Sequence, residues 1–251
     1  MSGHSKWSTI KRKKGKIDEQ RGKVFTQISK EIFVAVRQGG PDPDGNFRLK
    51  LCIQKAKSNN MPMENVNRAI QKAAGNVEGV AYDEVVYEGY GPAGVAIMCD
   101  ILTDNRNRVA SDVRYIFSRN HGNLGETGCV SYLFNRKGRM TIAAEGIDAD
   151  EVMLAALDAG AEDVITEDEE EIEIVTAPED LESVKNAIEA AGYETKEAEI
   201  TMLPETTIEI TDEQQAKQVL TLLGKLEDYD DIQNVYSNAD IPEEIMEKIA
   251  D

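Results

Sequence analysis

The sequence has few of the residues from which catalytic and metal sites are most often built. It contains three cysteines, two histidines and one tryptophan in 251 residues. Cys52, Cys99 and Cys129 are odd in number and far apart, which argues against a disulfide framework and against a zinc site. His4 and His121 are isolated, and neither belongs to a pattern that pairs a nucleophile with a base. We therefore expect no enzyme activity, no catalytic residues, no metal and no cofactor.

Long apolar runs are also lacking. No stretch approaches the ~20 apolar residues that a membrane helix needs, and the first residues do not resemble a secretory signal. The hydrophobic content of 41% is nevertheless enough for globular cores. The composition predicts a folded, cytoplasmic protein that has no membrane partner.

Basic and acidic residues are distributed unevenly along the sequence. Acidic side chains are few in the first part of the chain, and basic side chains are few in the last part. Residues 1–79 carry 16 basic against 7 acidic side chains, a net charge of +9. Residues 80–140 carry 7 of each, and residues 141–251 carry 5 basic against 33 acidic, a net charge of −28. Partner binding follows the local field, so the basic head can bind an anion although the whole chain is acidic.

The basic head is the clearest candidate for nucleic-acid binding. Clustered Lys and Arg bind phosphates with release of counterions, and an interleaved aromatic ring can stack on an unpaired base. A solubilising tail, or an arm docked on the acidic domain of the same or another copy, is the alternative. The candidate contact residues are Lys6, Trp7, Lys11, Arg12, Lys13, Lys14, Lys16, Arg21 and Lys23.

Helical periodicity follows this head. Apolar spacing predicts helices over about 18–38 and 46–58, and a third that starts near Pro62 and ends at Gly75. Three short helices are expected to form a small bundle, so that residues 1–79 would be a first domain.

The rest of the chain predicts two α/β domains. Strands are expected at 83–88 and 95–102, followed by a helix after Asp104 and a further extended segment at 129–134. Residues 136–202 have the βαββαβ order of a ferredoxin-like domain. Residues 80–135 and 203–251 would together complete a second ferredoxin-like domain into which this one is inserted. The fold class is therefore α+β with three domains.

Two local motifs have simple structural explanations. Gly89, Gly91 and Gly94 match G-x-G-x-x-G, but a strand pattern rather than a helix follows, which indicates a turn between strands. The acidic run 167–171 resembles a carboxylate cluster, but consecutive side chains point in different directions. It is typical of a solvated loop.

The helix after Asp104 and the glycine-rich segment 122–128 each allow two interpretations. Arg106, Arg108 and Arg119 could make secondary contacts with phosphates, or could belong to a solvated face with pairs such as Asp104–Arg108. The three glycines of 122–128 could let a ligand approach the backbone, or could supply the positive φ that a loop needs.

Several of these segments together resemble the YebC/PmpR family. They are GHSKW at 3–7, KRKKGKIDEQRGKVF at 11–25, NNMPMENVNRAI at 59–70, YEGYGPAGVA at 88–96, TDNRNR at 103–108 and GNLGETGCVSYLF at 122–134. Members are usually called probable transcriptional regulatory proteins, and one is a mitochondrial translational activator of a cytochrome oxidase subunit. The resemblance implies three domains around an open cleft and a cytoplasmic, non-enzymatic regulator.

Two alternative functions are therefore compatible with the sequence. The first is a DNA-binding transcriptional regulator that contacts phosphates through its basic head. The second is a ribosome-associated translation factor that binds ribosomal RNA, with its acidic domain facing ribosomal or other basic proteins. An enzyme is disfavoured by the absence of a nucleophile–base pair or a cofactor loop.

The phosphate role of the head makes a measurable prediction. Replacing Lys11, Arg12, Lys13 and Lys14 by Ala is expected to flatten the plot of log K against log salt by about 3 units, at ~0.7–0.9 per phosphate contact. Binding measured between low and moderate salt provides the slope. An unchanged slope would exclude these four side chains as phosphate contacts.

Overall fold

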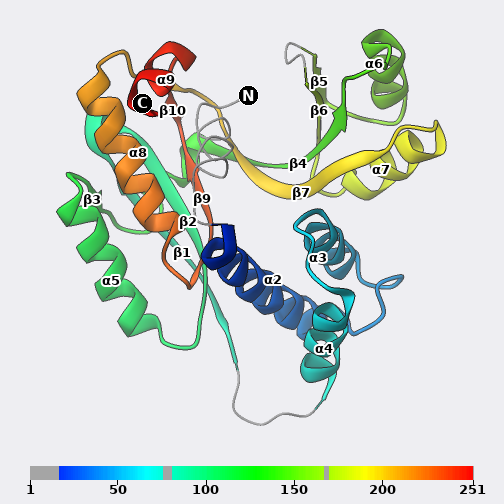
Figure 1. Ribbon diagram of the computed structural model, residues 1–251, viewed down its shortest axis with the longest axis horizontal. Coiled ribbons are helices and arrows are strands. Elements are labelled where there is room, and N and C mark those ends of the chain that lie inside the picture. Colours follow the sequence, from blue (N-terminus) through cyan, green and yellow to red (C-terminus); the bar gives the residue numbers. More distant parts are fainter. Residues whose placement is uncertain (1–16, 76–80, 167–169, 251) are drawn as a thin grey trace. The chain divides into compact units, whose positions relative to one another are not determined.

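The computed structural model describes residues 17–75, 81–166 and 170–250 (Figure 1). These residues divide into two compact units, which are described separately. The first unit contains residues 17–30, 81–135 and 204–250, and the second contains 31–75, 136–166 and 170–203. Each unit combines helices with a four-stranded sheet, which confirms the expected mixture of helices and strands.

The sheet of the first unit is antiparallel. Its strands are β1 (Asp83–Tyr90), β2 (Ala96–Thr103), β3 (Asn123–Leu124) and β9 (Ile232–Ser237), in the order β3-β1-β2-β9. A 3-10 turn at Pro92–Gly94 joins β1 to β2. The G-x-G-x-x-G segment is thus a turn between strands, as predicted.

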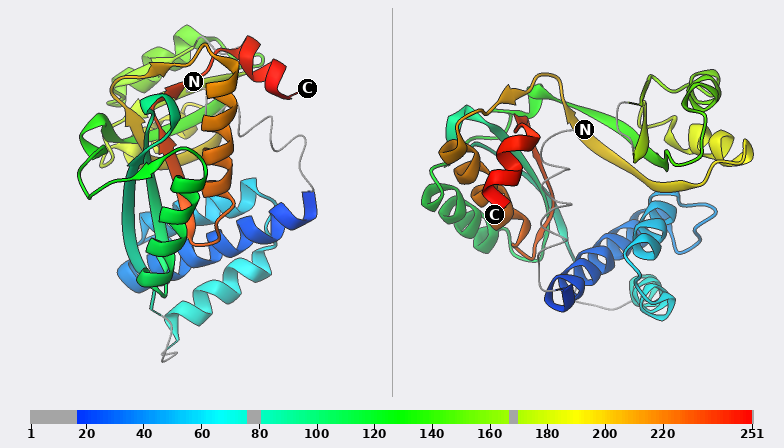
Figure 2. Two further views of the ribbon diagram at one scale, coloured as in Figure 1. Left: turned by 90° about the vertical axis from the view of Figure 1, so that its left-hand side faces the viewer. Right: turned by 45° about the horizontal axis from the view of Figure 1, so that its top comes forward.

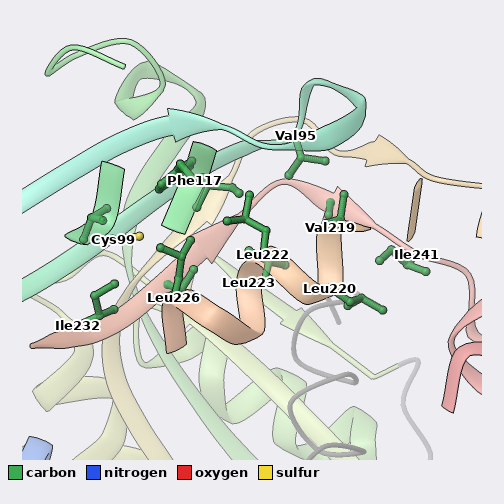
Figure 3. Packing of buried hydrophobic residues seen from close by; sticks show 14 of the residues in the cluster. Val95, Cys99, Phe117, Val219, Leu220, Leu222, Leu223, Leu226, Ile232 and Ile241 are labelled. Atoms are coloured by element: carbon green, nitrogen blue, oxygen red, sulfur yellow. The ribbon is translucent and has the colours of Figure 1, made fainter. Parts of the chain in front are cut away.

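Helices α5 (Arg106–Arg119) and α8 (Glu213–Glu227) cover one face of this sheet (Figure 2). Alternate residues of β2 face them, and Cys99 packs among Phe117 of α5 and the leucines of α8 (Figure 3). A short parallel pair, β8 (Ile208–Glu209) and β10 (Ala239–Asp240), and helix α9 (Glu243–Ala250) complete the unit. β2 is buried along nearly its whole length, and its alternate residues Ile97, Cys99 and Ile101 pack against the buried sides of α5 and α8 to give two layers.

The second unit contains the predicted inserted domain. Strands β4 (Phe134–Ala143), β5 (Asp163–Ile165), β6 (Glu171–Thr176) and β7 (Thr195–Pro204) follow the order β5-β6-β4-β7. Helices α6 (Ala149–Asp158) and α7 (Leu181–Ala190) pack with them. This strand order is the ferredoxin-like one. The first unit has the same two layers but a different strand order, because β1 and β2 form a direct hairpin there.

Helices α2 (Ile17–Gly39), α3 (Phe47–Ser58) and α4 (Met63–Ala74) lie close to their predicted positions. Phe47 and Leu51 of α3 pack against the core of the inserted domain. Gln54 Nε2 also donates to the Thr195 carbonyl at 3.4 Å. The contacts therefore group α3 and α4 with the inserted domain, and the separate three-domain division stays a prediction.

One expected strand does not form. Residues 129–134 alternate like a strand, but the structure has a 3-10 turn at Ser131–Leu133 before β4 begins. The amides of Val130 and Ser131 donate to the Glu88 carboxylate at 2.9 and 2.8 Å. Because these donors are occupied by a side chain, they are not available to a strand ladder.

A buried carboxylate joins several segments of the first unit. Asp231 is only 6% exposed and accepts from Lys30 Nζ at 2.6 Å, Arg108 Nη2 at 2.7 Å and Thr103 Oγ1 at 3.0 Å. Burial opposes ionisation of this carboxyl, but the hydrogen bonds from Lys30 and Arg108 outweigh it and lower its pKa. Asp231 thereby connects α2, α5 and the end of β2.

Removing this carboxylate should destabilise the first unit. Asp231→Ala leaves the largely buried Lys30 ammonium without its charge partner, and we expect a loss of about 3 kcal/mol in the free energy of unfolding. Urea unfolding of the full chain measures it. The neighbouring Asp230 is exposed, so Asp230→Ala should change stability by less than about 0.5 kcal/mol. Equal losses in the two variants would contradict the role of Asp231.

Candidate nucleic-acid interface

Most of the predicted contact residues of the head cannot be placed. Lys6, Trp7, Lys11, Arg12, Lys13, Lys14 and Lys16 lie outside the described residues. Arg21 and Lys23 lie on the first part of α2, where Arg21 is exposed and Lys23 is half-buried. The role of the head in binding phosphate therefore stays a prediction.

Helix α5 has a defined rotation. The Asn105 side chain caps it by accepting from the Arg108 amide at 3.1 Å. Val109, Val113 and Phe117 are fully buried on its inner side. Helical geometry consequently turns the side chains at 107, 111, 114, 115 and 118 away from the core.

The arginines of α5 fall into two groups. Arg106 Nε lies 3.1 Å from Asp83, and Arg108 Nη2 lies 3.0 Å from Asp104 and 2.7 Å from Asp231. The hydrogen bond to Asp231 raises the pKa of Arg108 above its ordinary value. These two residues fit the alternative of an ion-paired face, since a phosphate would have to displace their carboxylates.

The second group has no acidic partner in the part of the chain that the structure describes. The Arg119 guanidinium lies 5.9 Å from the centroid of the Tyr115 ring, and Tyr115 is 63% exposed. Arg114, next to Tyr115, is also exposed. Sequence analysis included Arg119 among the possible phosphate contacts but left out Arg114, another arginine of the same helix. Its position one helical turn before Ser118, on the outer side, was the signal that could have found it.

The outward face of α5 therefore presents two exposed arginines and one exposed ring, with the Arg119 guanidinium over that ring. Ser111, Ser118 and Asn107 surround them and are also exposed. The single carboxylate within the helix, Asp112, accepts a hydrogen bond from the Tyr229 hydroxyl at 2.7 Å. Guanidinium groups bind phosphate oxygens, and an exposed ring can stack on a base. We call Arg114, Tyr115 and Arg119 the α5 patch.

The glycine-rich loop after α5 is organised by Glu88. Glu88 is 3% exposed, and one of its oxygens accepts from the Gly128 amide at 2.8 Å, while the other accepts from Val130 and Ser131. The Gly125 amide also donates to the Glu88 carbonyl at 2.8 Å. Burial opposes ionisation of Glu88, but the three backbone amides outweigh it and lower the pKa of the carboxyl.

The glycines of this loop have distinct roles. Gly128 has a φ of 91°, which is the left-handed region predicted for a loop glycine. Gly122 has no such φ, but a Cβ there would lie 2.9 Å from the Tyr90 carbonyl. The loop-forming interpretation therefore accounts for both residues.

Other kinds of site are not seen in the described ranges. Within residues 17–75, 81–166 and 170–250, no three His, Cys, Asp or Glu side chains are grouped to hold a metal ion. None of the helices in these ranges is both long and apolar enough to cross a membrane. Of the acidic run 167–171, only Glu170 and Glu171 belong to the residues that the structure describes.

Comparison with known proteins identifies the family. Residues 5–76 match the model of the TACO1/YebC protein N-terminal domain, and residues 82–239 match that of the TACO1/YebC second and third domain. The chain belongs to the TACO1/YebC family. This finding confirms the resemblance on which the sequence analysis relied.

Close relatives of this TACO1/YebC protein extend over its whole length. A protein of Moorella thermoacetica called "Probable transcriptional regulatory protein" is 56% identical, with 99% of each chain covered. A protein of Desulfotalea psychrophila with the same description is 55% identical over all of both chains. The crystal structure of a conserved hypothetical protein from Aquifex aeolicus is 49% identical, covers 91% of this chain and 93% of its own, and has a TM-score of 0.82.

The organising role of Glu88 can be tested by pH. Because its folded pKa is lowered, its stabilisation is complete above the ordinary glutamate range and is lost as pH falls through the lowered value. We expect the protection of the Gly128, Val130 and Ser131 amides, relative to the intrinsic exchange rate at each pH, to fall with acidification. Glu88→Gln should lower this protection already at neutral pH, and cost about 2 kcal/mol in stability.

Hydrogen exchange followed by NMR measures both effects. Glu126→Gln, which changes an exposed carboxylate in the same loop, is the matched control and should leave these amides unchanged. Protection that is independent of pH in the unmodified protein would contradict the assignment.

Proposed function

We propose that this protein is a non-enzymatic, nucleic-acid-binding regulator of gene expression that acts on DNA in the cytoplasm. The observation that carries the proposal is the α5 patch, where the Arg119 guanidinium lies over the exposed Tyr115 ring, Arg114 is exposed next to it in the helix, and neither arginine has an acidic partner among the described residues. The basic head would supply further phosphate contacts. The name of the relatives, "Probable transcriptional regulatory protein", supports a regulatory role.

The distribution of charge supports a restricted binding surface. Residues 141–203 carry 20 acidic and only 2 basic side chains. Both basic side chains are already paired, Lys185 with Glu189 at 2.6 Å and Lys196 with Glu171 at 3.3 Å. This segment repels phosphates, so a nucleic acid would be directed away from it and toward basic surfaces such as the α5 patch and the head.

The second candidate is an RNA-binding translation factor associated with the ribosome. The exposed ring of Tyr115 favours it, because bases are free to stack in single-stranded loops and bulges but are paired within a DNA duplex. The acidic domain would then face basic ribosomal proteins. Both candidates use the same α5 patch, and they differ in which nucleic acid is recovered with it.

Crosslinking in cells separates the two candidates. The intact protein is crosslinked by ultraviolet light, and the bound RNA and DNA are both sequenced. Discrete promoter peaks with background RNA support the DNA-binding regulator. Enrichment of ribosomal RNA at a few positions without DNA peaks supports the translation factor. Recovery of neither nucleic acid above a mock control contradicts the proposed function.

The α5 patch itself is tested in vitro with purified full-length variants. Replacing Arg114 and Arg119 by Ala should lower the slope of log K against log salt by about 1.4–1.8 units, at ~0.7–0.9 per phosphate. Arg68→Ala is the matched control, because Arg68 is also exposed but pairs with Glu64 at 2.8 Å. A slope that falls equally in the control would show that the α5 patch has no special role.

A further inference from the structure

Two tyrosines of the first unit are exposed next to each other, away from the α5 patch. Tyr132 in the 3-10 turn is 67% exposed, and Tyr90 at the end of β1 is 37% exposed. The Tyr90 hydroxyl donates to the Cys129 carbonyl at 3.0 Å. A hydrogen bond between the two tyrosine side chains raises the pKa of Tyr90. We call these two residues the tyrosine ledge.

The backbone next to the tyrosine ledge is fixed by hydrogen bonds to a buried carboxylate. The amide of Ser131, directly before Tyr132, donates to the buried Glu88 carboxylate at 2.8 Å, and Val130 is fully buried. A buried carboxylate is costly unless it is fully hydrogen-bonded, so its amide donors hold the turn in one position. The exposed ring of Tyr132 therefore projects from a fixed base.

The ledge offers ring faces to a ligand. The Tyr90 hydroxyl already donates to the Cys129 carbonyl. Large aromatic side chains that are exposed together mark interaction sites more often than single ones do. A flat, unsaturated ligand that is held by stacking fits such a surface.

The chain leads from the end of α5 to the edge strand β3, which pairs with β1 beside the ledge. Tyr90 of β1 is the register partner of Asn123 in the edge strand β3. Arg119, His121 and Asn123 are exposed in succession from the end of α5 to this strand, and no carboxylate interrupts residues 119–123. A phosphate chain bound at Arg119 can therefore continue to the ledge without meeting an acidic side chain on this segment.

We propose that the tyrosine ledge is a second stacking site, which binds an unpaired base of the same nucleic acid that the α5 patch holds by its phosphates. The site rests on the proposed function, and it adds a preference for single-stranded segments. Every base has a flat face, so the ledge selects strandedness rather than sequence.

The test uses the full-length protein and a single strand of about 12 nucleotides, within the site sizes of single-strand binding modules, that carries a fluorescent purine analogue. The same sequence in a duplex is the comparison probe. Tyr132→Ala should weaken single-strand binding on the order of 5- to 150-fold, as expected for the loss of one stacked base. It should also restore the fluorescence that stacking quenches.

Two further results must accompany this loss. The salt slope should not change, because no phosphate contact is removed, and duplex binding should weaken less than about 2-fold. Tyr132→Phe should bind like the unmodified protein, because it keeps the ring. Leu154→Ala is the matched control, since it removes another large, 65% exposed apolar side chain from a different unit and should change nothing.

The results can reject the stacking site at the tyrosine ledge without rejecting the proposed function. If Tyr132→Ala binds the single strand normally while the Arg114 and Arg119 variant loses salt dependence, the ledge is not a base site and the proposed function stands. A loss that is equal for single strand and duplex, or that Tyr132→Phe shares, also overturns the ledge and indicates a structural or protein-docking role. No binding of either probe by the unmodified protein overturns both.

Discussion

The first unit depends on the burial of the Asp231 carboxylate. Three donors from separate segments converge on it, and without the carboxylate Lys30 would lose its charge partner, Thr103 its acceptor and Arg108 one of its two carboxylates. The buried carboxylate thereby holds Arg108 at the start of α5. This contact adds to the Asn105 cap and to the buried side chains of α5, which turn Arg114 and Tyr115 outward. Fold and candidate interface thus depend on the same side chain.

Glu88 acts in a similar way where regular structure is missing. Its carboxylate replaces a strand ladder for the amides of residues 128, 130 and 131. A loop that is held by a buried charge can expose an aromatic ring without collapsing onto it. The two buried carboxylates together explain how a small sheet presents polar and aromatic groups at its edge in fixed positions.

Periodicity in the sequence was sufficient for the helices and for most strands, because their burial repeats over many residues. It gave the ferredoxin-like order of the inserted domain for the same reason. The prediction of a strand at 129–134 was wrong, because the amides of Val130 and Ser131 donate to the Glu88 carboxylate instead of to a neighbouring strand. Glu88 is distant in the sequence, so the local pattern of residues 129–134 does not reveal this contact. The Asp104–Arg108 pair was among the alternatives predicted from the sequence and does form, but the pairing of Arg106 and Arg108 with Asp83 and Asp231 was hidden, since those partners are distant in the sequence. The contacts predicted for the basic head remain predictions.

An acidic protein can bind a polyanion only where its local field is positive. Exposed charges are screened beyond about 8–10 Å at physiological salt, so the 33 carboxylates of residues 141–251 do not cancel a basic surface that is farther away than this. They do remove alternative surfaces on which a phosphate chain could settle. Ion pairing acts in the same sense within α5, because Arg106 and Arg108 are paired with carboxylates while Arg114 and Arg119 have no acidic partner among the described residues. Under the proposed function, these two unpaired arginines and the Tyr115 ring beside Arg119 would determine where on α5 a nucleic acid is held.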